Sequence, residues 1–332
     1  MSERLFLLFV VPFFRLSAFL LVFACAMTFG AATAAPPPAT VPVKAVKVAP
    51  HTWYVEGMRG VPSRQNQGFT SNAGFVVTPA GVVVFDALGT PPLGDALLKA
   101  IRSVTRQPVR RVIVSHFHAD HFYGLQAFKR IGAEVWADRR VEAYLQSDAP
   151  RARLRERKSS LAPWVDDTLQ IVVPDRYLDG DTQFELGGLH FSIARIGPAH
   201  TAEDITLAVR EDAVMFVGDL IFTGRVPFVG DADSKAWLAA IDKVLLARPR
   251  VLVPGHGSAS RNAGADLTLT RDYLVFLRHI MADAVRDFVP FEEVFKNTDW
   301  SRFSQLPAFD AANRINAYGT YLLLEKESLG PK

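Results

Sequence analysis

The segment that most constrains the fold of this chain is SHFHADH, at residues 115–121. It follows a run of β-branched residues that is typical of a buried strand. His116 and His118 are two residues apart at the end of that strand, so their side chains can point in the same direction. Asp120 and His121 come where the chain turns into the next helix. The fold therefore has to bring these polar side chains together at one edge of a sheet.

Three further polar residues, His200, Asp219 and His256, occupy similar places in loops that contain glycine or proline. Each comes just after a predicted strand, and these strands are 189–196, 213–217 and 251–253. Loops held by a rigid sheet often carry function. Five of the eight histidines belong to these motifs. Imidazole and carboxylate groups are ligands for zinc, and also for iron or manganese.

The remaining elements alternate between strands and helices in two similar halves. A hairpin is predicted from the β-branched runs 74–78 and 82–86. Apolar residues at helical spacing predict helices, with Leu125, Phe128 and Ile131 on the inner face of one of them. The predicted helices are 93–104, 125–131, 234–246, 267–288 and 314–329, and the other strands are 109–115, 133–137 and 205–209. This order favours an α+β fold with two packed sheets and helices outside.

The composition is that of a globular protein. Hydrophobic residues make up 49% of the 332 and charged residues 21%, which excludes a disordered or fibrous chain. Lys and Arg number 37 against 34 Asp and Glu, a formal net charge of +3. So small a charge gives no electrostatic reason to expect nucleic acid as a partner. We expect a small-molecule substrate instead.

Residues 1–35 have the pattern of a secretory signal peptide. Positive charges precede an apolar run at 16–29, and small residues follow it up to Ala34, where cleavage is expected. We therefore expect export to a bacterial periplasm, without stable membrane association after cleavage. The alternatives are an uncleaved anchor formed by residues 5–29 and a lipid anchor on Cys25, the only cysteine.

The motifs HFHADH, GPAHTAED, GDLIF and PGHG, in this order, resemble those of the metallo-β-lactamase superfamily. The resemblance covers a domain at 51–260. A linker and first strand at 36–50 precede that domain, and a C-terminal helical extension at 261–332 follows it. The resemblance implies an αββα sandwich with a dinuclear metal site at one edge.

The resemblance also assigns the ligands of two metal ions, expected to be zinc, with iron or manganese as alternatives. They are His116, His118 and His200 for the first ion, Asp120, His121 and His256 for the second, and Asp219 as a bridge between the two. True β-lactamases of the superfamily have cysteine or serine where this chain has Asp219. A bridging aspartate resembles the glyoxalase II ligand set, which thioesterases and lactonases share. Residues 218–237 also resemble exported zinc hydrolases associated with quinoprotein and sulfur-oxidation systems.

The implied reaction is hydrolysis of an ester, thioester, lactone or amide bond. Two cations lower the pKa of a bound water from about 15.7 toward 7, so that a metal-bridging hydroxide can attack the carbonyl. Asp120 would hold the second metal and orient that hydroxide. Asp86 is predicted to hydrogen-bond a ligand histidine, or else to cap the helix or turn before Pro91. Arg225 follows Asp219 closely enough to bind a substrate carboxylate, or else forms a surface salt bridge.

The walls of the substrate pocket are expected to come from loops at 60–72, 145–165 and 223–232. One of these segments contains RARLRERK, at residues 151–158, with five positive charges against one negative. This basic run is either a solvated helix face or loop, or a rim that attracts an anionic substrate. No pattern in these segments predicts a particular substrate or oligomeric state.

Three other functions are compatible with the motifs. The first is β-lactamase activity. The second is a persulfide dioxygenase with a single iron held by His116, His200 and Asp219, which metal identity and oxygen dependence would distinguish from a hydrolase. The third is a non-catalytic periplasmic binding protein. The sequence has no insertion like the nuclease-specific domain of the RNA-processing members, which again argues against nucleic acid.

Overall fold

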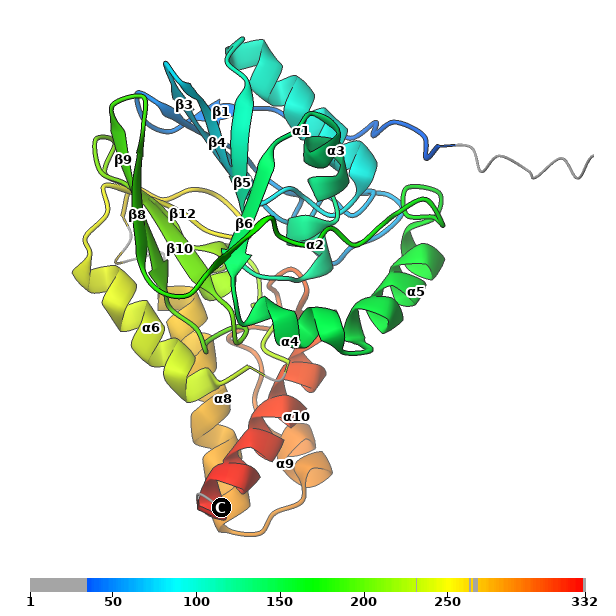
Figure 1. The fold of residues 1–332 in the computed structure, drawn as a ribbon. Helices are drawn as coiled ribbons and strands as arrows, with labels where there is room; N and C mark the ends of the chain where they lie inside the picture. Colours follow the sequence, from blue (N-terminus) through cyan, green and yellow to red (C-terminus); the bar gives the residue numbers. More distant parts are fainter. Residues whose placement is uncertain (1–34, 231, 263, 265–267, 331–332) are drawn as a thin grey trace, which may run out of the picture. The chain divides into compact units, whose positions relative to one another are not determined.

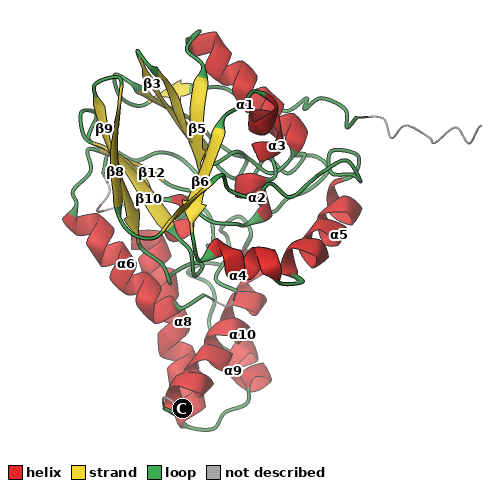
Figure 2. Ribbon diagram, in the orientation of Figure 1, coloured by secondary structure: helices red, strands yellow, loops and turns green. Residues whose placement is uncertain are grey.

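Two β-sheets packed face to face form the centre of the fold, and helices cover their outer faces (Figures 1 and 2). The computed structural model describes residues 35–230, 232–262, 264 and 268–330. The predicted signal peptide, with its anchor alternatives, therefore lies outside the described residues except for Ala35. Among the described helices, none has the length and hydropathy needed to cross a membrane.

Each half of the chain supplies one sheet, as predicted. The first sheet has the strand order β1-β2-β3-β4-β5-β6-β7, antiparallel up to β4 and parallel beyond it. Its strands are Val46–Lys47, Thr52–Val55, Ala73–Thr78, Gly81–Phe85, Val109–Ile113, Glu134–Asp138 and Arg176–Leu178. The second sheet has the order β12-β11-β10-β9-β8, with only β11 and β12 parallel. Its strands, from β8 to β12, are Thr182–Leu186, Leu189–Arg195, Ile205–Val209, Val214–Phe216 and Val251–Val253.

Two of the helices begin at a residue whose side chain caps them. Thr90 caps α1, because its hydroxyl accepts a hydrogen bond from the backbone N–H of Leu93. Asp233 caps α6 in the same way through the N–H of Ala236. The described α-helices are α1 Pro91–Val104, α2 Ala119–Phe122, α3 Leu125–Arg130, α4 Val141–Gln146, α5 Ala149–Leu161, α6 Ser234–Leu246, α8 Thr268–Arg286, α9 Phe291–Asn297 and α10 Phe309–Ser328.

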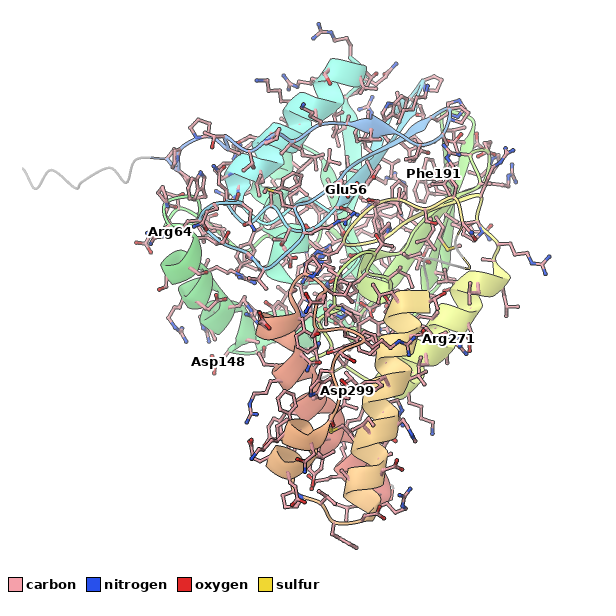
Figure 3. All side chains as sticks on the ribbon, turned by 180° about the vertical axis from the view of Figure 1, so that it is seen from behind. Glu56, Arg64, Asp148, Phe191, Arg271 and Asp299 are labelled. Carbon is pink, nitrogen blue, oxygen red and sulfur yellow. The ribbon has the colours of Figure 1, made fainter. Side chains whose placement is uncertain are left out.

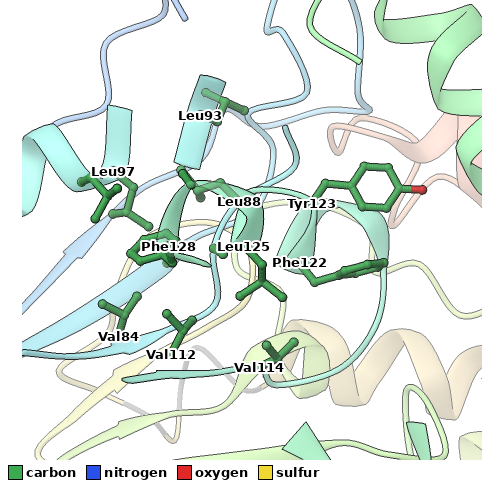
Figure 4. Close-up of a cluster of buried hydrophobic side chains, with 14 of the residues drawn as sticks. Val84, Leu88, Leu93, Leu97, Val112, Val114, Phe122, Tyr123, Leu125 and Phe128 are labelled. Atoms are coloured by element: carbon green, nitrogen blue, oxygen red, sulfur yellow. The ribbon is translucent and has the colours of Figure 1, made fainter. Parts of the chain in front are cut away.

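The valine run of β4 shows how the layers are held together. Val82 and Val84 pack on one side of the first sheet against α1 and α3, as the side chains around Val84 in Figure 4 show. Val83 and Phe85 point to the opposite side, into the core between the two sheets. Successive strand residues alternate in direction. A strand that is apolar on both faces therefore has to lie inside a layered fold.

The C-terminal helices share a hydrophobic core with the second sheet. Tyr273 and Leu277 of α8 belong to the same buried cluster as Trp237 of α6 and Leu252 of β12. Residues 35–332 accordingly form one compact unit. The predicted helical extension is therefore packed into the sandwich and can help to shape its functional edge.

The structure corrects three predicted details. Ile131 was expected on the inner face of α3, but it follows the last turn of that helix and is 42% exposed. The last helix begins at Phe309, five residues before the predicted start at Arg314. The segment expected as a loop at 145–165 contains the end of α4 and all of α5. α5 escaped detection because its buried residues, Pro150 and Leu161, stand only at its two ends.

Candidate metal centre

The predicted metal ligands lie together at one edge of the sandwich, each a few residues beyond a strand. They are, in chain order, His116, His118, Asp120, His121, His200, Asp219 and His256. The first four follow β5 and continue into α2. The other three follow β9, β11 and β12, Asp219 lying in a short 3₁₀ helix. The first sheet thus supplies one side of the cluster and the second sheet the other.

The glycine of the PGHG motif makes room for Asp219. A Cβ atom at Gly255 would collide with Oδ1 of Asp219 and with the backbone of Gly218. The N–H of Gly255 also donates to the carbonyl of Gly218 over 2.6 Å. Glycine at this position therefore lets the loops after β11 and β12 approach closely enough for Asp219 and His256 to share a site.

The donor atoms separate into two groups that could each hold a metal ion. One group is His116, His118, His200 and Asp219, and the other is Asp120, His121 and His256. Within each group, the possible ligand atoms lie within 4.8 Å of one another. Asp219 also approaches the second group, because its Oδ2 lies 3.3 Å from Nε2 of His256. The structure thus brings the predicted ligands together in the two predicted sets.

Hydrogen bonds on the outer side of three histidines settle which nitrogen faces the site. His116 Nδ1 lies 2.9 Å from the hydroxyl of Ser115, and that hydroxyl donates to Asp86. Nδ1 must therefore be the donor, which leaves a lone pair on Nε2. His121 Nδ1 donates to Asp86 over 2.9 Å. His256 Nδ1 donates in the same way to the backbone carbonyl of Thr70 over 2.7 Å. Such outer partners orient metal-binding imidazoles.

The atoms that face the centre of the site are better placed to bind a cation than to hydrogen-bond with one another. His118 Nδ1 lies 3.2 Å from Nε2 of His116 and 2.9 Å from Nε2 of His200, so imidazole nitrogens converge on one point. In the second group, Nε2 of His121 and Oδ1 of Asp219 are 3.1 Å apart. Both atoms are buried without a hydrogen-bond partner in the described part of the chain. Buried polar atoms rarely stay unpaired, and nitrogen and carboxylate donors suit zinc, iron or manganese.

Burial keeps the histidines of the first group neutral. Desolvation lowers the pKa of His118 to about 4 and that of His200 to about 3. The pKa of His116 also falls well below its ordinary value because of burial. Neutral imidazole is the form that binds metal. The site is therefore ready to accept a cation at neutral pH without first releasing protons from these side chains.

The two aspartates stay ionised despite their surroundings. Burial alone would raise the pKa of Asp120, but His121 and His256 outweigh it and lower that pKa to about 2. The same two histidines hold the pKa of Asp219 well below its usual value against the effect of burial. His121 shows the reverse: burial favours its neutral form, yet the carboxylates around it raise its pKa. The two ionised carboxylates at the centre of the site would therefore be stabilised by a bound cation.

Arg225 is buried beside the metal ligands. Its side chain is 5% exposed, and its Nη1 donates to the carbonyl of Gly60 over 2.7 Å and lies 3.3 Å from Nδ1 of His256. No carboxylate forms an ion pair with it among the described residues. The surface salt bridge considered for Arg225 is therefore excluded. Asp86 hydrogen-bonds with His121 and Ser115. Capping of the helix that begins at Pro91, the other role considered for Asp86, is performed by Thr90.

A pocket with a cavity volume of about 180 Å³ opens over the two donor groups. Its floor includes His118, Asp120, Asp219 and His256. Its walls come from each of the three predicted segments, and also from the start of α10, which the sequence did not indicate. The wall residues are Val61, Pro62, Thr70, Ala119, Arg153, Arg157, Phe222, Arg225, Phe228, Ala311 and Ala312. A concave site that combines apolar lining with a few converging polar groups is typical of small-molecule binding.

A sequence model of the metallo-β-lactamase superfamily matches residues 66–256. This match covers more than half of the chain and includes every residue of the two donor groups. The chain belongs to the metallo-β-lactamase superfamily. Members of this superfamily bind metal ions and hydrolyse small-molecule substrates, which agrees with the donor set and with the pocket above it. The recognised family and the α+β sandwich predicted with it are thereby confirmed.

Characterised relatives within the superfamily include β-lactamases and an alkylsulfatase. The chain is 25% identical over 198 residues to a metallo-beta-lactamase type 2 from Elizabethkingia meningoseptica, covering 57% of this chain and 69% of the relative. It is 21% identical to metallo-beta-lactamase IND-1 from Chryseobacterium indologenes, over 57% of this chain and 72% of the relative. It is 19% identical to a linear primary-alkylsulfatase from Pseudomonas sp., over 61% of this chain but only 45% of that protein.

Solved structures show the same fold at low sequence identity. A metallo-beta-lactamase from Pontibacter korlensis superposes with a TM-score of 0.54 and 23% identity, over 70% of this chain and 99% of that one. A stereoselective inverting sec-alkylsulfatase from Pseudomonas sp. superposes with a TM-score of 0.64 and 17% identity. The latter match covers 87% of this chain and 52% of the sulfatase.

The C-terminal helices lie outside the superfamily match, yet they hold the loop that carries Arg225 and Phe228. The amide oxygen of Asn316, in α10, accepts the N–H groups of Val229 and Gly230 over 2.7 and 3.3 Å. Its amide nitrogen donates to the carbonyl of Pro227 over 2.8 Å. Asn316 is fully buried. The shape of this pocket wall therefore depends on a residue that no motif indicated.

Two other residues of the site were missed by sequence reasoning. Ser115 stands inside the histidine motif and links Asp86 to His116. Thr70 orients His256 through its carbonyl, a contact any residue type could make. The position of Ser115 at the end of a strand, next to a predicted ligand, was a usable signal. Thr70 left none, because backbone acceptors have no sequence signature.

Proposed function

We propose that this protein is an exported hydrolase with two zinc ions that cleaves an ester, thioester, lactone or amide bond of a small molecule. The observation that carries the proposal is the pair of adjacent donor groups, with Asp219 within reach of both. The superfamily match supports metal-dependent hydrolysis. A single-metal enzyme would have no use for the second, equally well-oriented group.

The donor set suits this chemistry. We infer that His116, His118 and His200 hold the first ion, that Asp120, His121 and His256 hold the second, and that Asp219 bridges them. When bound, two cations of this kind supply Lewis acidity and make a water molecule acidic enough to lose a proton near pH 7. The chain's own contribution is orientation, through the outer hydrogen bonds of the histidines, and exclusion of bulk water by the pocket walls.

Asp120 is placed to act on the attacking water. Its carboxylate lines the pocket and is 17% exposed, whereas the side chain of Asp219 is 4% exposed. Its low pKa keeps it ionised, so it can accept a hydrogen bond from water at neutral pH. Its Oδ2 lies 3.4 Å from Nε2 of His256, on the side of the second donor group. We infer that Asp120 would help to hold the second ion and would orient the attacking water.

Arg225 is our candidate for binding a negatively charged part of the substrate next to the reacting bond. It lines the pocket and is buried beside His256, and its Nη2 has no hydrogen-bond partner among the described residues. A buried guanidinium without a carboxylate partner is unfavourable unless an anion completes the site. A carboxylate or another oxyanion of the substrate would satisfy it through charge-assisted hydrogen bonds.

A second candidate reaction is hydrolysis of an alkyl sulfate ester. A sec-alkylsulfatase superposes on 87% of the chain, and a primary-alkylsulfatase is a sequence relative. The pocket combines apolar residues such as Phe222 and Phe228 with arginines, as an alkyl chain joined to a sulfate would require. β-Lactam hydrolysis is less favoured, because Asp219 stands where β-lactamases have cysteine or serine.

The test is to purify the mature protein, measure its metals by elemental analysis, and assay a panel of substrates. The panel contains p-nitrophenyl acetate, a thioester, a lactone, an anilide, a β-lactam and dodecyl sulfate. Two zinc ions per chain and turnover of a carbonyl substrate are expected. One iron with oxygen-dependent persulfide oxidation would establish the dioxygenase instead. Full metal loading without any turnover would revive the non-catalytic binding protein.

We also propose that the mature chain begins after Ala34 and is exported. The support is the sequence pattern of residues 1–35 alone. Expression of the full chain in a Gram-negative host, followed by fractionation and N-terminal sequencing, tests this. A periplasmic product that starts near Ala35 is expected. An intact N-terminus in the membrane fraction would instead show that the segment is kept as an anchor.

A further inference from the structure

Helix α5 borders the pocket with a narrow apolar face and a basic surface. Leu154 and Leu161, seven residues apart, pack against the hydrophobic core of the first sheet. The basic run of residues 151–158 occupies most of the other positions of the helix. The side chain of Asp148, just before the helix, is 91% exposed (Figure 3). The apolar contacts explain why the helix packs there, but they do not explain why charged side chains line the pocket.

Two arginines of α5, Arg153 and Arg157, line the pocket. They are four residues apart, so they stand one above the other on the same face of the helix. Like charges at this spacing destabilise a helix. The arrangement is thus unfavourable for α5 itself, and a role toward the pocket is the simpler explanation for it.

The two charges that face the pocket share one carboxylate, whereas two of the other three charges in the basic run have a carboxylate each. Arg151 has its own partner in Asp148 at 2.6 Å, and Lys158 has Asp167 at 2.6 Å. Arg153 and Arg157, by contrast, share the single carboxylate of Glu156, at 3.2 and 3.5 Å. The side chain of Arg157 is only 16% exposed, so water screens it incompletely. An excess positive charge therefore remains on the pocket side of the helix.

The two arginines face the same space as the metal ligands. The pocket that Arg153 and Arg157 line is also lined by His118 and Asp120. A molecule bound over the metal ligands can therefore extend toward both guanidiniums.

We propose that Arg153 and Arg157 form a subsite for an oxyanion, a carboxylate or a sulfate, carried by the substrate at the end remote from the bond that is cleaved. This inference rests on the proposed function and adds the substrate class. Val61, Phe228 and Ala312 form apolar lining in the same pocket. The substrate is therefore an amphiphile: a reactive group over the metal ligands, an apolar middle, and a negative charge that the two guanidiniums bind.

The subsite is tested by binding, without turnover. Metal-loaded mature protein is titrated calorimetrically with monocarboxylates and with dicarboxylates of the same length: pentanoate against pentanedioate, and decanoate against decanedioate. One carboxylate occupies the metal centre in either compound, so the difference reports the second. At one of the two lengths, we expect the dicarboxylate to bind at least about tenfold more tightly than the monocarboxylate. An effect of this size is typical of hydrogen bonds to charged groups.

Matched variants assign the difference to the proposed residues. The double variant Arg153→Gln/Arg157→Gln is expected to lose the preference for the dicarboxylate. The control Arg151→Gln, on the outward side of the same helix, removes a positive charge without touching the pocket and is expected to keep it. Arg153→Lys/Arg157→Lys keeps the charge and is expected to retain part of it. Circular dichroism and metal content, unchanged in each variant, exclude unfolding as the cause.

The outcomes separate this inference from the proposed function. Equal binding of monocarboxylates and dicarboxylates at both lengths, or a preference that survives in the double glutamine variant, overturns the subsite. If the preference depends on Arg153 and Arg157 but no substrate of the panel is hydrolysed, the subsite stands and the proposed hydrolase fails. If p-nitrophenyl pentanoate and the mono-p-nitrophenyl ester of pentanedioate are both hydrolysed, a lower KM for the anionic ester that the double variant abolishes supports both.

Discussion

The floor of the pocket and its outer wall are built in opposite ways. The floor consists of histidines and aspartates that follow strand ends and are mostly buried, with outer hydrogen bonds to Asp86, Ser115 and Thr70. The wall comes from α5, the loop after Asp219 and the start of α10, and includes charged side chains that are partly exposed. We infer that the floor determines the class of reaction, whereas the wall determines which substrate reaches it.

The largest effect is expected from removing the carboxylate of Asp219, at the centre of the pocket floor. Asp219→Ala should remove the bridge between the two donor groups, so the purified protein should lose most of its metal. Hydrolysis should fall by more than the about 10–100-fold that losing an outer partner of a metal ligand costs. Elemental analysis and steady-state assays measure both. Asp212→Ala is the control, because Asp212 is buried against His51 and Thr52 outside the pocket. Full metal content and activity in Asp219→Ala would refute the bridge.

A smaller effect is expected from changing Asp86, which hydrogen-bonds with a candidate metal ligand. Asp86→Asn should weaken the orientation of His121 and Ser115, and lower metal affinity by about 10–100-fold. Asparagine is the suitable replacement because residue 86 has a φ of 63°, which asparagine tolerates. Competition with a chelator measures the affinity. Asp138→Asn, at a buried carboxylate bound to Arg140 and Arg195, is the control. An unchanged affinity would mean that Asp86 only supports the fold.

The wall is tested from the C-terminal helices. Asn316→Ala leaves the N–H groups of Val229 and Gly230 unpaired. It should cost about 2–6 kcal/mol of stability, given about 1–3 kcal/mol for each unsatisfied buried group. It should also raise KM without lowering metal content, because the loop that carries Arg225 loosens. Asn313→Ala is the matched control: it is buried on the same helix and bonds Tyr273 but not the loop. Equal KM values for the two variants would show that Asn316 does not position the wall.

The last effect concerns the stability of the metal-free protein and its dependence on pH, with no change expected in the chemistry of the site. Burial raises the pKa of Asp204 to about 8, although Thr201 donates two hydrogen bonds to it. The folded state therefore keeps a proton that the unfolded chain releases near pH 4. Stability should be fully present below that pH and should decline as the pH rises toward 8, by at most about 1.4 kcal/mol per unit. Urea unfolding from pH 5 to 8 should show this decline in the wild type and less of it in Asp204→Asn. Identical slopes would contradict the assigned titration.

The sequence predicted the floor far better than the wall. The histidine motif and the three later loops each combine a strand, a turn residue and a ligand within a few positions, and the structure brings all of these ligands together. The basic run of α5 was considered as a solvated helix face or loop and as a rim. Its helix was not predicted, because only Leu154 and Leu161 mark an apolar face within it. Nothing in the sequence connected α10 with the pocket, although Ala311 and Ala312 line it and Asn316 holds one of its loops.

The sequence by itself determined the family, the two-sheet sandwich and the set of candidate ligands, because these depend on short-range patterns: strand alternation, ligand spacing and glycines at close approaches. Only the tertiary structure decided that Arg225 is buried, that Arg153 and Arg157 face the pocket, and that α10 closes it. The physical reason is that these features arise from packing between segments remote in the sequence. Which face of a polar helix meets a cavity is decided by its neighbours in space, and its own residue pattern does not record it.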